Sequence, residues 1–268
     1  MRTIVITNDK GGVAKTTTVA NLAVGLVREG YKTLVVDMDL QGDVTDVILG
    51  ARPPLLSEKE IVPRTAYTLM LERHKLTEVM LEAPRYPNLF VVPSNRDLSQ
   101  ASAQLANKPG SQTVLRHILQ TTPNSYDYVV IDTGKGLDLL VINALAAADD
   151  VIIMTTPGKL ELDAVERMHA TVEEVRTRTL LGAKTPQVLG IVLAKADHYS
   201  IAQDTKTFLK KRYPGNVFKT VLPKNDDIGK ALARSLSVFE FNPRSKGAIA
   251  YNQLLKEILW QLNPKKLV

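Results

Sequence analysis

The apolar run Ile4–Thr7 is followed almost at once by the segment Lys10–Thr17, which reads KGGVAKTT. Two adjacent glycines let backbone N–H groups close on phosphate oxygens with no side chain in the way. A lysine and two threonines then open a helical pattern, and a helix N-terminus favours an anion. Because such a loop functions between a buried strand and a helix, this segment predicts an α/β fold with a nucleotide phosphate site.

The loop residues have separate expected roles. The nucleotide-binding candidates are Lys10, Gly11, Gly12, Val13, Ala14, Lys15, Thr16 and Thr17. Lys15 is expected to neutralise the β- and γ-phosphates, and the Thr16 hydroxyl to coordinate Mg²⁺. The strict phosphate-loop pattern is not met, since Asp9 and Ala14 stand where that pattern has glycine. An ordinary strand-to-helix turn is the alternative interpretation.

Acidic residues end two further apolar runs. Asp37 and Asp39 come directly after one run, separated by a single residue, and Asp132 comes directly after another. Because ligands of doubly wound sheets bind at the carboxyl ends of the strands, these carboxylates are expected beside the phosphates. Asp37 or Asp39 can orient water or hold the hydration shell of Mg²⁺, and Asp132 is expected to be a second Mg²⁺ anchor. A turn-capping role would account for a single such aspartate.

Short apolar runs alternate with helical patterns along the chain. The expected strands are residues 4–7, 33–36, 89–92, 128–131, 151–154, 188–193 and 217–222, and the expected helices include 16–29, 137–147, 160–180 and 201–213. This alternation predicts a doubly wound, mainly parallel sheet with helices on both faces. We expect residues 1–268 to form one domain, with the proline-containing stretch Ala51–Arg64 as a surface excursion.

Composition excludes several kinds of site. The absence of cysteine rules out disulfides, iron–sulfur clusters and thiolate zinc sites, and it fits a reducing cytoplasm. The histidines have no metal-ligand spacing; they are His74, His117, His169 and His198. No apolar run reaches the roughly 18 residues of a membrane span. A net charge of +6 permits an anionic partner such as nucleic acid without requiring one.

Taken together, these segments resemble the ParA/MinD family of deviant Walker A ATPases, and specifically its ParA partition branch. The loop Lys10–Thr17 resembles the family's deviant Walker A loop, whose hallmark is an additional lysine matched here by Lys10. The resemblance extends over nearly the whole chain, through the segments Asp37–Thr45, Val92–Asn95, Asn143–Asp149 and Asn242–Ala248.

The resemblance implies an ATPase that uses ATP and Mg²⁺ and forms a homodimer with ATP between its two subunits. Lys10 would reach the partner's nucleotide, Asp39 would position the attacking water, and Asp132 would hold Mg²⁺ through its hydration shell, with support from Asp37. The catalytic candidates are therefore Lys10, Lys15 and Asp39. A small ParB-like adaptor would stimulate slow hydrolysis in a cytoplasmic, nucleoid-associated protein. Because the chain opens with its first strand, we do not expect the operator-binding helix-turn-helix of longer relatives.

Some positions depart from the family pattern. Ala14 replaces a usual glycine, Leu40 replaces a usual proline, and Gly134–Gly136 stands where the family often has Pro-Pro-Ser. Lys135, within that last segment, is expected to face solvent, with a phosphate or interface contact as the alternative. Pro223 and Lys224 match a family stretch near the adenine, so we expect them to contact the base.

ParA-type proteins bind DNA without sequence preference, which requires lysines and arginines directed at phosphates. The leading DNA candidates are Lys224, Lys230 and Arg234, from a basic set that also includes Lys195, Lys206, Lys210, Lys211, Arg212 and Lys219. If these residues share one face, they would form the DNA-binding patch.

Two alternatives remain open. The first is a MinD-like regulator that cycles on membranes through an amphipathic C-terminal helix. Residues Tyr251–Leu262 have that pattern but few basic residues, so a helix docked on the sheet is favoured and a membrane partner is not expected. The second is a metabolic or metal-delivery enzyme on the same fold, and the lack of cysteine counts against its cysteine-dependent versions.

Overall fold

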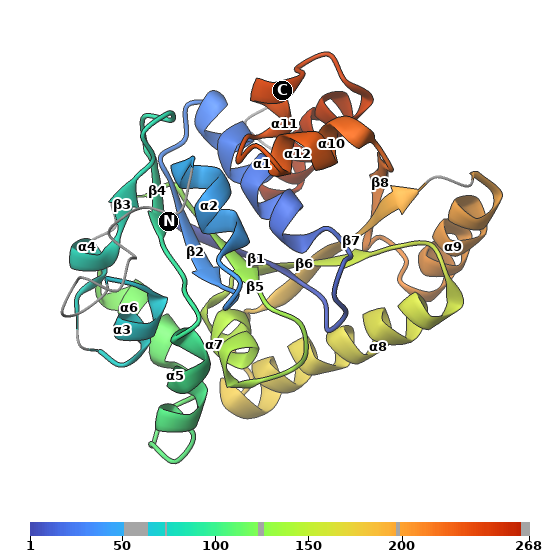
Figure 1. The fold of residues 1–268 in the computed structure, drawn as a ribbon. Coiled ribbons are helices and arrows are strands. Elements are labelled where there is room, and N and C mark those ends of the chain that lie inside the picture. Colours follow the sequence, from blue (N-terminus) through green and yellow to red (C-terminus); the bar gives the residue numbers. More distant parts are fainter. Residues whose placement is uncertain (51–63, 73, 123–125, 197–198, 264–268) are drawn as a thin grey trace.

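The computed structural model describes residues 1–50, 64–72, 74–122, 126–196 and 199–263 (Figure 1). Of the predicted surface excursion Ala51–Arg64, residues 51–63 lie outside the described residues, and Arg64 is exposed. His198 also lies outside them.

The strands are β1 (Arg2–Thr7), β2 (Thr33–Met38), β3 (Leu81–Glu82), β4 (Leu89–Val92), β5 (Tyr128–Thr133), β6 (Asp150–Thr155), β7 (Gln187–Ala196) and β8 (Val217–Pro223). The helices are α1 (Lys15–Arg28), α2 (Asp43–Leu49), α3 (Ala66–Met70), α4 (Leu76–Val79), α5 (Leu98–Leu105), α6 (Val114–Thr121), α7 (Leu139–Ala147), α8 (Lys159–Glu174), α9 (Tyr199–Arg212), α10 (Asp226–Leu232), α11 (Val238–Phe241) and α12 (Lys246–Leu262), and a π-helical turn, Val175–Thr179, continues α8.

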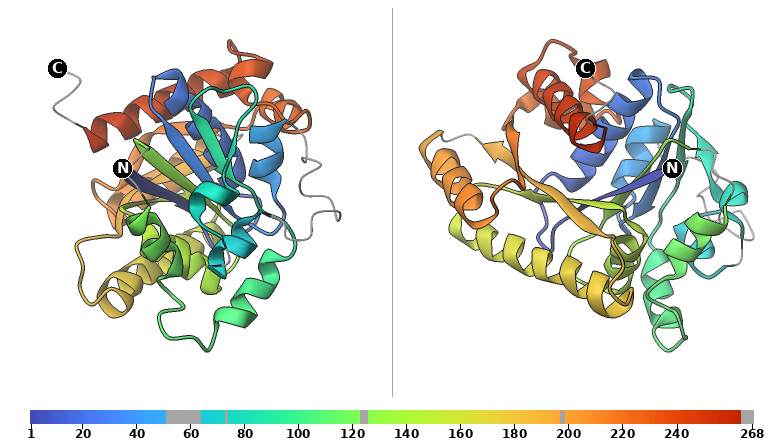
Figure 2. Two further views of the ribbon diagram at one scale, coloured as in Figure 1. Left: turned by 90° about the vertical axis from the view of Figure 1, so that its left-hand side faces the viewer. Right: turned by 180° about the vertical axis from the view of Figure 1, so that it is seen from behind.

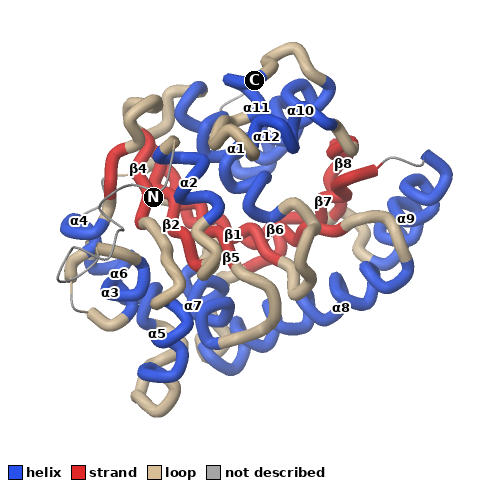
Figure 3. Tube along the Cα trace, in the orientation of Figure 1, coloured by secondary structure: helices blue, strands red, loops and turns tan. Residues whose placement is uncertain are grey.

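The strands form an eight-stranded sheet in the order β3-β4-β2-β5-β1-β6-β7-β8. Every pairing is parallel except that of the short strand β3 with β4. The sheet forms one band between two layers of helices (Figure 3), and the layers stay on opposite sides of it in the views of Figure 2. The predicted doubly wound, mainly parallel α/β fold is confirmed.

Two hydrophobic cores lie on the two faces of the sheet. One packs residues of α1, α2, α11 and α12 against one side of the central strands. The other packs residues of α3, α5, α6, α7, α8 and α9 against the opposite side. Neighbouring residues of one strand contribute to different cores, as Ile4 and Val5 of β1 do. This is why the strand sequences are apolar without alternation.

Strand order decides what meets at the carboxyl edge of the sheet. β5 lies between β2 and β1, and it pairs with both in parallel. In that register Asp37 of β2 is directly opposite Asp132 of β5, and Ile6 of β1 is opposite Asp132 from the other side. The ends of the three strands thus place both aspartates beside the loop that follows β1.

The helix boundaries differ from the expected ones for local reasons. The helix expected from Leu137 begins at Leu139, because the Asp138 side chain caps it by accepting hydrogen bonds from the N–H groups of Leu140 and Val141. The helix expected over 160–180 is α8 followed by the π-helical turn. The short helices α2 to α6, α10 and α11 were not predicted, since each has eight residues or fewer and helical periodicity is read over windows of about 11–18 residues.

Candidate nucleotide-binding site

The loop between β1 and α1 is shaped by its own backbone. The buried Asn8 side chain donates to the Met154 carbonyl of β6 and accepts from the Lys10 N–H at 2.9 Å. Ala14, at the N-cap of α1, has a left-handed φ of 70°. A non-glycine residue in this conformation costs about 1–2 kcal/mol. The departure at Ala14 therefore places strain in the loop at the position where the family has glycine.

Lys15 is folded back along the loop. Its side chain is only 7% exposed, and its Nζ donates to the carbonyls of Asn8 at 3.1 Å and of Lys10 at 2.8 Å. Burial lowers the pKa of Lys15, and the carboxylates of Asp132, Asp39 and Asp9 act in the opposite direction. Lys15 is thus a shielded cation held among carbonyls and carboxylates, which suits a phosphate-binding ammonium group.

Asp37 and Asp132 form a buried carboxylate pair across β2 and β5. The hydroxyl of Thr45 donates to Asp37 Oδ2 at 2.6 Å, and the Asp39 N–H donates to Asp37 Oδ1 at 3.1 Å. Burial, with a smaller contribution from the charge of Asp39, raises the pKa of Asp37 to about 7 despite the hydrogen bonds from Thr45. Burial, followed by the charge of Asp37, raises the pKa of Asp132 well above its usual range.

These carboxylates fit Mg²⁺. Among the described residues, neither carboxylate oxygen of Asp132 has a hydrogen-bond partner, although both are buried. Buried anions without partners are costly, and a divalent cation would favour their ionised form. Thr16, the second residue of α1, lines the same cavity as Asp39, and its hydroxyl approaches Asp132 closely enough to lower the pKa of that carboxyl. One or two carboxylates, a hydroxyl and water are the oxygen donors that Mg²⁺ uses beside phosphates.

A cavity of about 440 Å³ lies in front of the loop. Its walls include the predicted residues Gly11, Gly12, Ala14, Lys15, Thr16, Thr17 and Asp39. Asp39 lies against the backbone of Gly134, and its Oδ1 accepts from the Gln41 N–H at 3.1 Å. Lys135 is exposed, as expected, and it also borders the cavity. Of the three predicted carboxylates, Asp39 lines this cavity, whereas Asp37 and Asp132 are buried behind it.

A second cavity, of about 540 Å³, adjoins the first. The two share Ala14, Thr17 and Lys195, and the second is lined more by apolar groups, among them Leu222 and Ile228. Pro223 and Lys224, predicted to lie near the adenine, line this cavity. A more polar cavity at the loop joined to a more apolar one at its side suits a nucleotide, whose phosphates and base need these two environments.

The site includes residues that the sequence did not single out for nucleotide binding. Lys195, at the end of β7, has a left-handed φ of 53° and borders both cavities. Arg167 of α8 donates to Asp9 Oδ2 at 2.7 Å, and Glu161 of α8 pairs with Lys10 at 3.2 Å. The position of Lys195 at the end of a strand is the one local cue that could have indicated it. The two ion pairs have no local cue, because each joins segments about 150 residues apart.

The basic residues of the last third do not lie on one face. Helix α9, with Lys206, Lys210 and Lys211, packs with the core on the α8 side of the sheet, whereas α10 packs with the core on the α12 side. Lys224 and Lys230 line the second cavity, and the Arg234 guanidinium lies 5.1 Å from the centre of the Phe241 ring. The condition for a single patch, that all these residues share one face, is therefore not met by α9 and α10, whereas Lys224, Lys230 and Arg234 lie in one region, around α10.

Most apolar residues of the C-terminal helix α12 face the protein, with Ile249 and Trp260 as exposed exceptions. Leu254, Leu255, Ile258 and Leu259 are buried, and α12 packs against α1 and β8. The expected docking of this helix on the sheet is confirmed. In the part of the chain that the structure describes, no helix has the length and hydropathy needed to cross a membrane.

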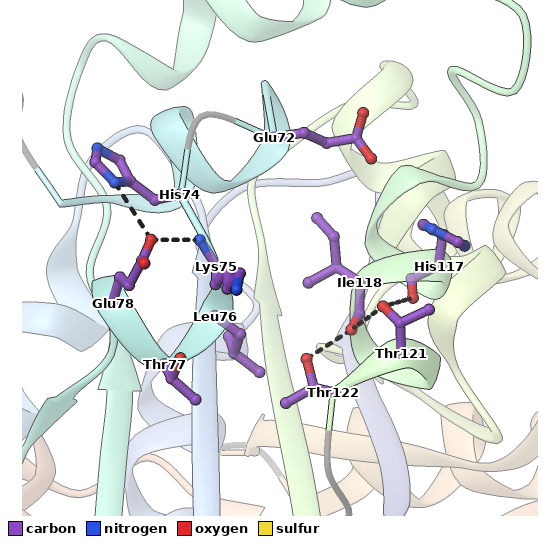
Figure 4. A pocket seen from close by; sticks show the side chains of 10 residues that line it. All are labelled: Glu72, His74, Lys75, Leu76, Thr77, Glu78, His117, Ile118, Thr121 and Thr122. Atoms are coloured by element: carbon purple, nitrogen blue, oxygen red, sulfur yellow. Dashed lines mark hydrogen bonds and ion pairs between the residues drawn. The ribbon is translucent and has the colours of Figure 1, made fainter.

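A further cavity, of about 500 Å³, lies between α4 and α6 (Figure 4). His74 and His117 line it from different elements, and His74 Nδ1 lies 3.6 Å from Glu78 Oε2. Among the described residues, no group of three or more histidine, aspartate or glutamate side chains is arranged to hold a metal ion by itself. Neither the phosphate-loop residues nor the three predicted aspartates line this cavity.

Sequence comparison finds relatives along the whole chain. A profile of an AAA domain family, AAA_31, matches residues 1–183. The sporulation initiation inhibitor protein Soj of Bacillus subtilis is 32% identical over 256 residues, which cover 95% of this chain and 97% of Soj. The chromosome-partitioning ATPase Soj of Thermus thermophilus is 34% identical over 262 residues, covering 97% of this chain and 96% of that protein.

Structural comparison gives the same fold. Cobyrinic acid a,c-diamide synthase from Mycobacterium smegmatis, solved with an ATP analogue and magnesium, superposes with a TM-score of 0.81 at 27% identity. The match covers 98% of this chain and 96% of that one.

Proposed function

The chain belongs to the ParA/MinD family of P-loop ATPases, and from that membership we propose that it works as a ParA-type partition or positioning ATPase. As a member of this family it hydrolyses ATP, with Mg²⁺ as cofactor. In the proposed cycle, ATP binding joins two copies into a homodimer, the dimer binds DNA without sequence preference, and a ParB-like adaptor stimulates slow hydrolysis. The protein would act in the cytoplasm, on the nucleoid.

The observation that carries the proposed dimer is the surface around Lys10. The Lys10 side chain is 31% exposed at the rim of the site. Two exposed leucines adjoin residues that contact this part of the loop. Leu160, 69% exposed, precedes the Glu161 that contacts Lys10, and Leu137, 43% exposed, follows the Gly136 whose N–H donates to the Asp9 carbonyl. Exposed apolar side chains around a cation, beside a nucleotide site, favour association with a second copy whose phosphates need positive charge.

Within one subunit the proposed chemistry uses residues already in place. Lys15 would contact the β- and γ-phosphates, while the N–H groups of Gly11, Gly12 and the start of α1 would bind phosphate oxygens. Mg²⁺, when bound, neutralises phosphate charge, and Thr16 and Asp132 would hold it. Asp39, facing the cavity, would orient the attacking water. Pro223 and Lys224 would contact the base in the adjoining cavity.

Replacing Lys10 by alanine is expected to separate nucleotide binding from dimerisation. The Lys10→Ala variant keeps Lys15 and both buried carboxylates, so its affinity for ATP should stay within about threefold of the wild type, because a rim cation contributes less than a buried one. The ATP-dependent dimer should be lost, since two facing triphosphates would then repel without a cation donated by the partner. Multi-angle light scattering with Mg²⁺ and ATP measures this. A variant that still dimerises with ATP contradicts the role of Lys10.

DNA retention tests the proposed function as a whole. With ATP and Mg²⁺ the protein should bind duplex DNA of any sequence, and the affinity should fall steeply with salt because lysines and arginines displace counterions. The double variant Lys230→Ala/Arg234→Ala should bind more weakly and lower the salt slope by about 2, or one for each lost phosphate contact. Lys108→Ala, an exposed lysine after α5 on the other face of the sheet, is the matched control. Retention without ATP, or without salt dependence, would contradict the proposal.

Two alternative functions would give different results with the same purified protein. A membrane-cycling regulator would bind anionic vesicles with ATP, which requires α12 to expose residues that are buried against α1 and β8. An enzyme that amidates a small acid, as the name of the Mycobacterium smegmatis protein indicates for that chain, would hydrolyse ATP only together with such a substrate. Full-length similarity to two Soj proteins favours the partition role.

A further inference from the structure

Two adjacent loop residues, Asp9 and Lys10, are each tied to helix α8. Arg167 Nε donates to Asp9 Oδ2 at 2.7 Å, and Lys10 Nζ lies 3.2 Å from Glu161 Oε1. The side chains of Lys10 and Glu161 are 31% and 24% exposed, so their pair is partly shielded from water. Lys10 is therefore held by its own subunit, at the edge of its own site.

Glu161 is placed for this contact by the start of α8. It is the third residue of the helix, where a carboxylate interacts favourably with the positive end of the helix dipole. Gly158, just before the helix, has a φ of 148°, and a Cβ at this position would lie 2.2 Å from Glu161 Oε2. Any side chain at residue 158 would thus occupy the space of the Glu161 carboxylate.

We propose that Glu161 is a positioning residue for Lys10: it holds the lysine within its own subunit and thereby raises the protein concentration at which the ATP dimer forms. The inference rests on the proposed function, in which Lys10 contacts the partner's nucleotide. An ammonium group paired with Glu161 on α8 has to leave that carboxylate to reach phosphates across an interface. The apparent dimer affinity then falls by the fraction of molecules in which Lys10 is free.

The exposed Leu160 beside Glu161 supports this competition. A second copy that covers Leu160 also removes water from the Lys10–Glu161 pair. The Glu161 carboxylate and the partner's triphosphate then compete for the Lys10 ammonium group. A triphosphate keeps more negative charge than a single carboxylate even with Mg²⁺ bound, so Lys10 should move to it once ATP is bound to the partner. Glu161 would then raise the protein concentration needed for the ATP dimer without preventing dimerisation.

The first test measures Lys10 directly, in the nucleotide-free monomer. An amine-acylating reagent and peptide mass spectrometry give the labelling rate of Lys10. Glu161→Gln should raise this rate by about 3- to 10-fold, as expected for loss of a partly exposed ion pair and its shielding. Glu166→Gln is the matched control: it removes the same charge from the same helix, and its partner is Arg212, at 2.9 Å, not the loop. Its Lys10 labelling should equal that of the wild type.

The second test measures the dimer. With Mg²⁺ and ATP, Glu161→Gln should lower the protein concentration at half-dimerisation by about 4- to 25-fold, because each dimer releases two such pairs and each pair contributes about 2- to 5-fold. Glu166→Gln should leave it unchanged. Glu161→Asp keeps a carboxylate at the helix N-terminus but shortens its reach, so it should behave like Glu161→Gln. This variant also serves if the glutamine variant folds poorly.

The outcomes separate this inference from the function on which it rests. The role of Glu161 is overturned if Lys10 labelling is unchanged in both Glu161 variants, or if either variant forms a weaker ATP dimer. The proposed function still stands in that case, provided that the wild-type chain forms the ATP dimer. A wild-type chain that stays monomeric with Mg²⁺ and ATP overturns the proposed function itself, whatever the labelling shows.

Discussion

The Lys15→Ala variant is expected to lose ATP binding, with an affinity at least about 30-fold below that of the wild type. Lys15 is buried, and its Nζ has only the carbonyls of Asn8 and Lys10 as direct hydrogen-bond partners among the described residues, within reach of three carboxylates. Removing one partner of a buried charge interaction costs about 2–5 kcal/mol, and each 1.4 kcal/mol is tenfold in affinity. Titration calorimetry with Mg²⁺ and ATP measures the loss.

The control for this variant separates binding from folding. Lys15 is the first residue of α1, where alanine is well tolerated, so the nucleotide-free variant should keep the wild-type unfolding temperature to within a few degrees. Lys108→Ala removes the same charge at an exposed position and should bind ATP as the wild type does. ATP binding by Lys15→Ala within tenfold of the wild type would mean that the loop does not bind phosphates in the way described.

The Asp39→Ala variant is expected to bind ATP and to hydrolyse it about 10²- to 10⁴-fold more slowly, the usual range for losing a residue that positions or accepts a proton. Asp39 borders the loop cavity and is not part of the fully buried carboxylate pair, so its loss should leave Mg²⁺ binding in place. Because hydrolysis ends the proposed dimer state, the variant should also accumulate as an ATP-bound dimer. Phosphate release and light scattering on the same sample measure both effects.

Two further variants sharpen that test. Asp39→Asn keeps the shape of the side chain and removes its charge, so a hydrolysis rate near that of Asp39→Ala would assign the effect to the carboxylate. Asp204→Ala, on the exposed side of α9, removes an aspartate far from the loop in the sheet order and should hydrolyse ATP at the wild-type rate. Wild-type phosphate release from Asp39→Ala would refute the assignment.

The strands were predictable because burial on both faces leaves a direct signal in the sequence. Val, Ile and Leu runs marked seven of the eight strands, and the two-residue β3 was missed because it has no such run. The phosphate loop and the acidic strand ends followed from the same logic, since parallel strands end at one edge. The register that sets Asp37 opposite Asp132 was not predictable, because it depends on which strands are neighbours.

Contacts between residues far apart in the chain could not be predicted from the sequence. The pairs Lys10–Glu161 and Asp9–Arg167 join the loop to a helix that follows β6, and no spacing rule relates them. Whether the basic residues near the C-terminal end share a face was left open by the sequence. Helices α9 and α10 pack with cores on opposite sides of the sheet, which the charge pattern alone does not reveal. Ala14 was visible as a departure, whereas its left-handed backbone was not.

The central claim is that the loop between β1 and α1, with Lys15 and the carboxylates of Asp37, Asp39 and Asp132, forms a site for ATP and Mg²⁺. Titration calorimetry of ATP into the folded, nucleotide-free chain tests it most directly. We expect saturable binding of one nucleotide per chain that weakens strongly when Mg²⁺ is chelated. A folded chain that takes up no adenine nucleotide in magnesium buffer would contradict the account.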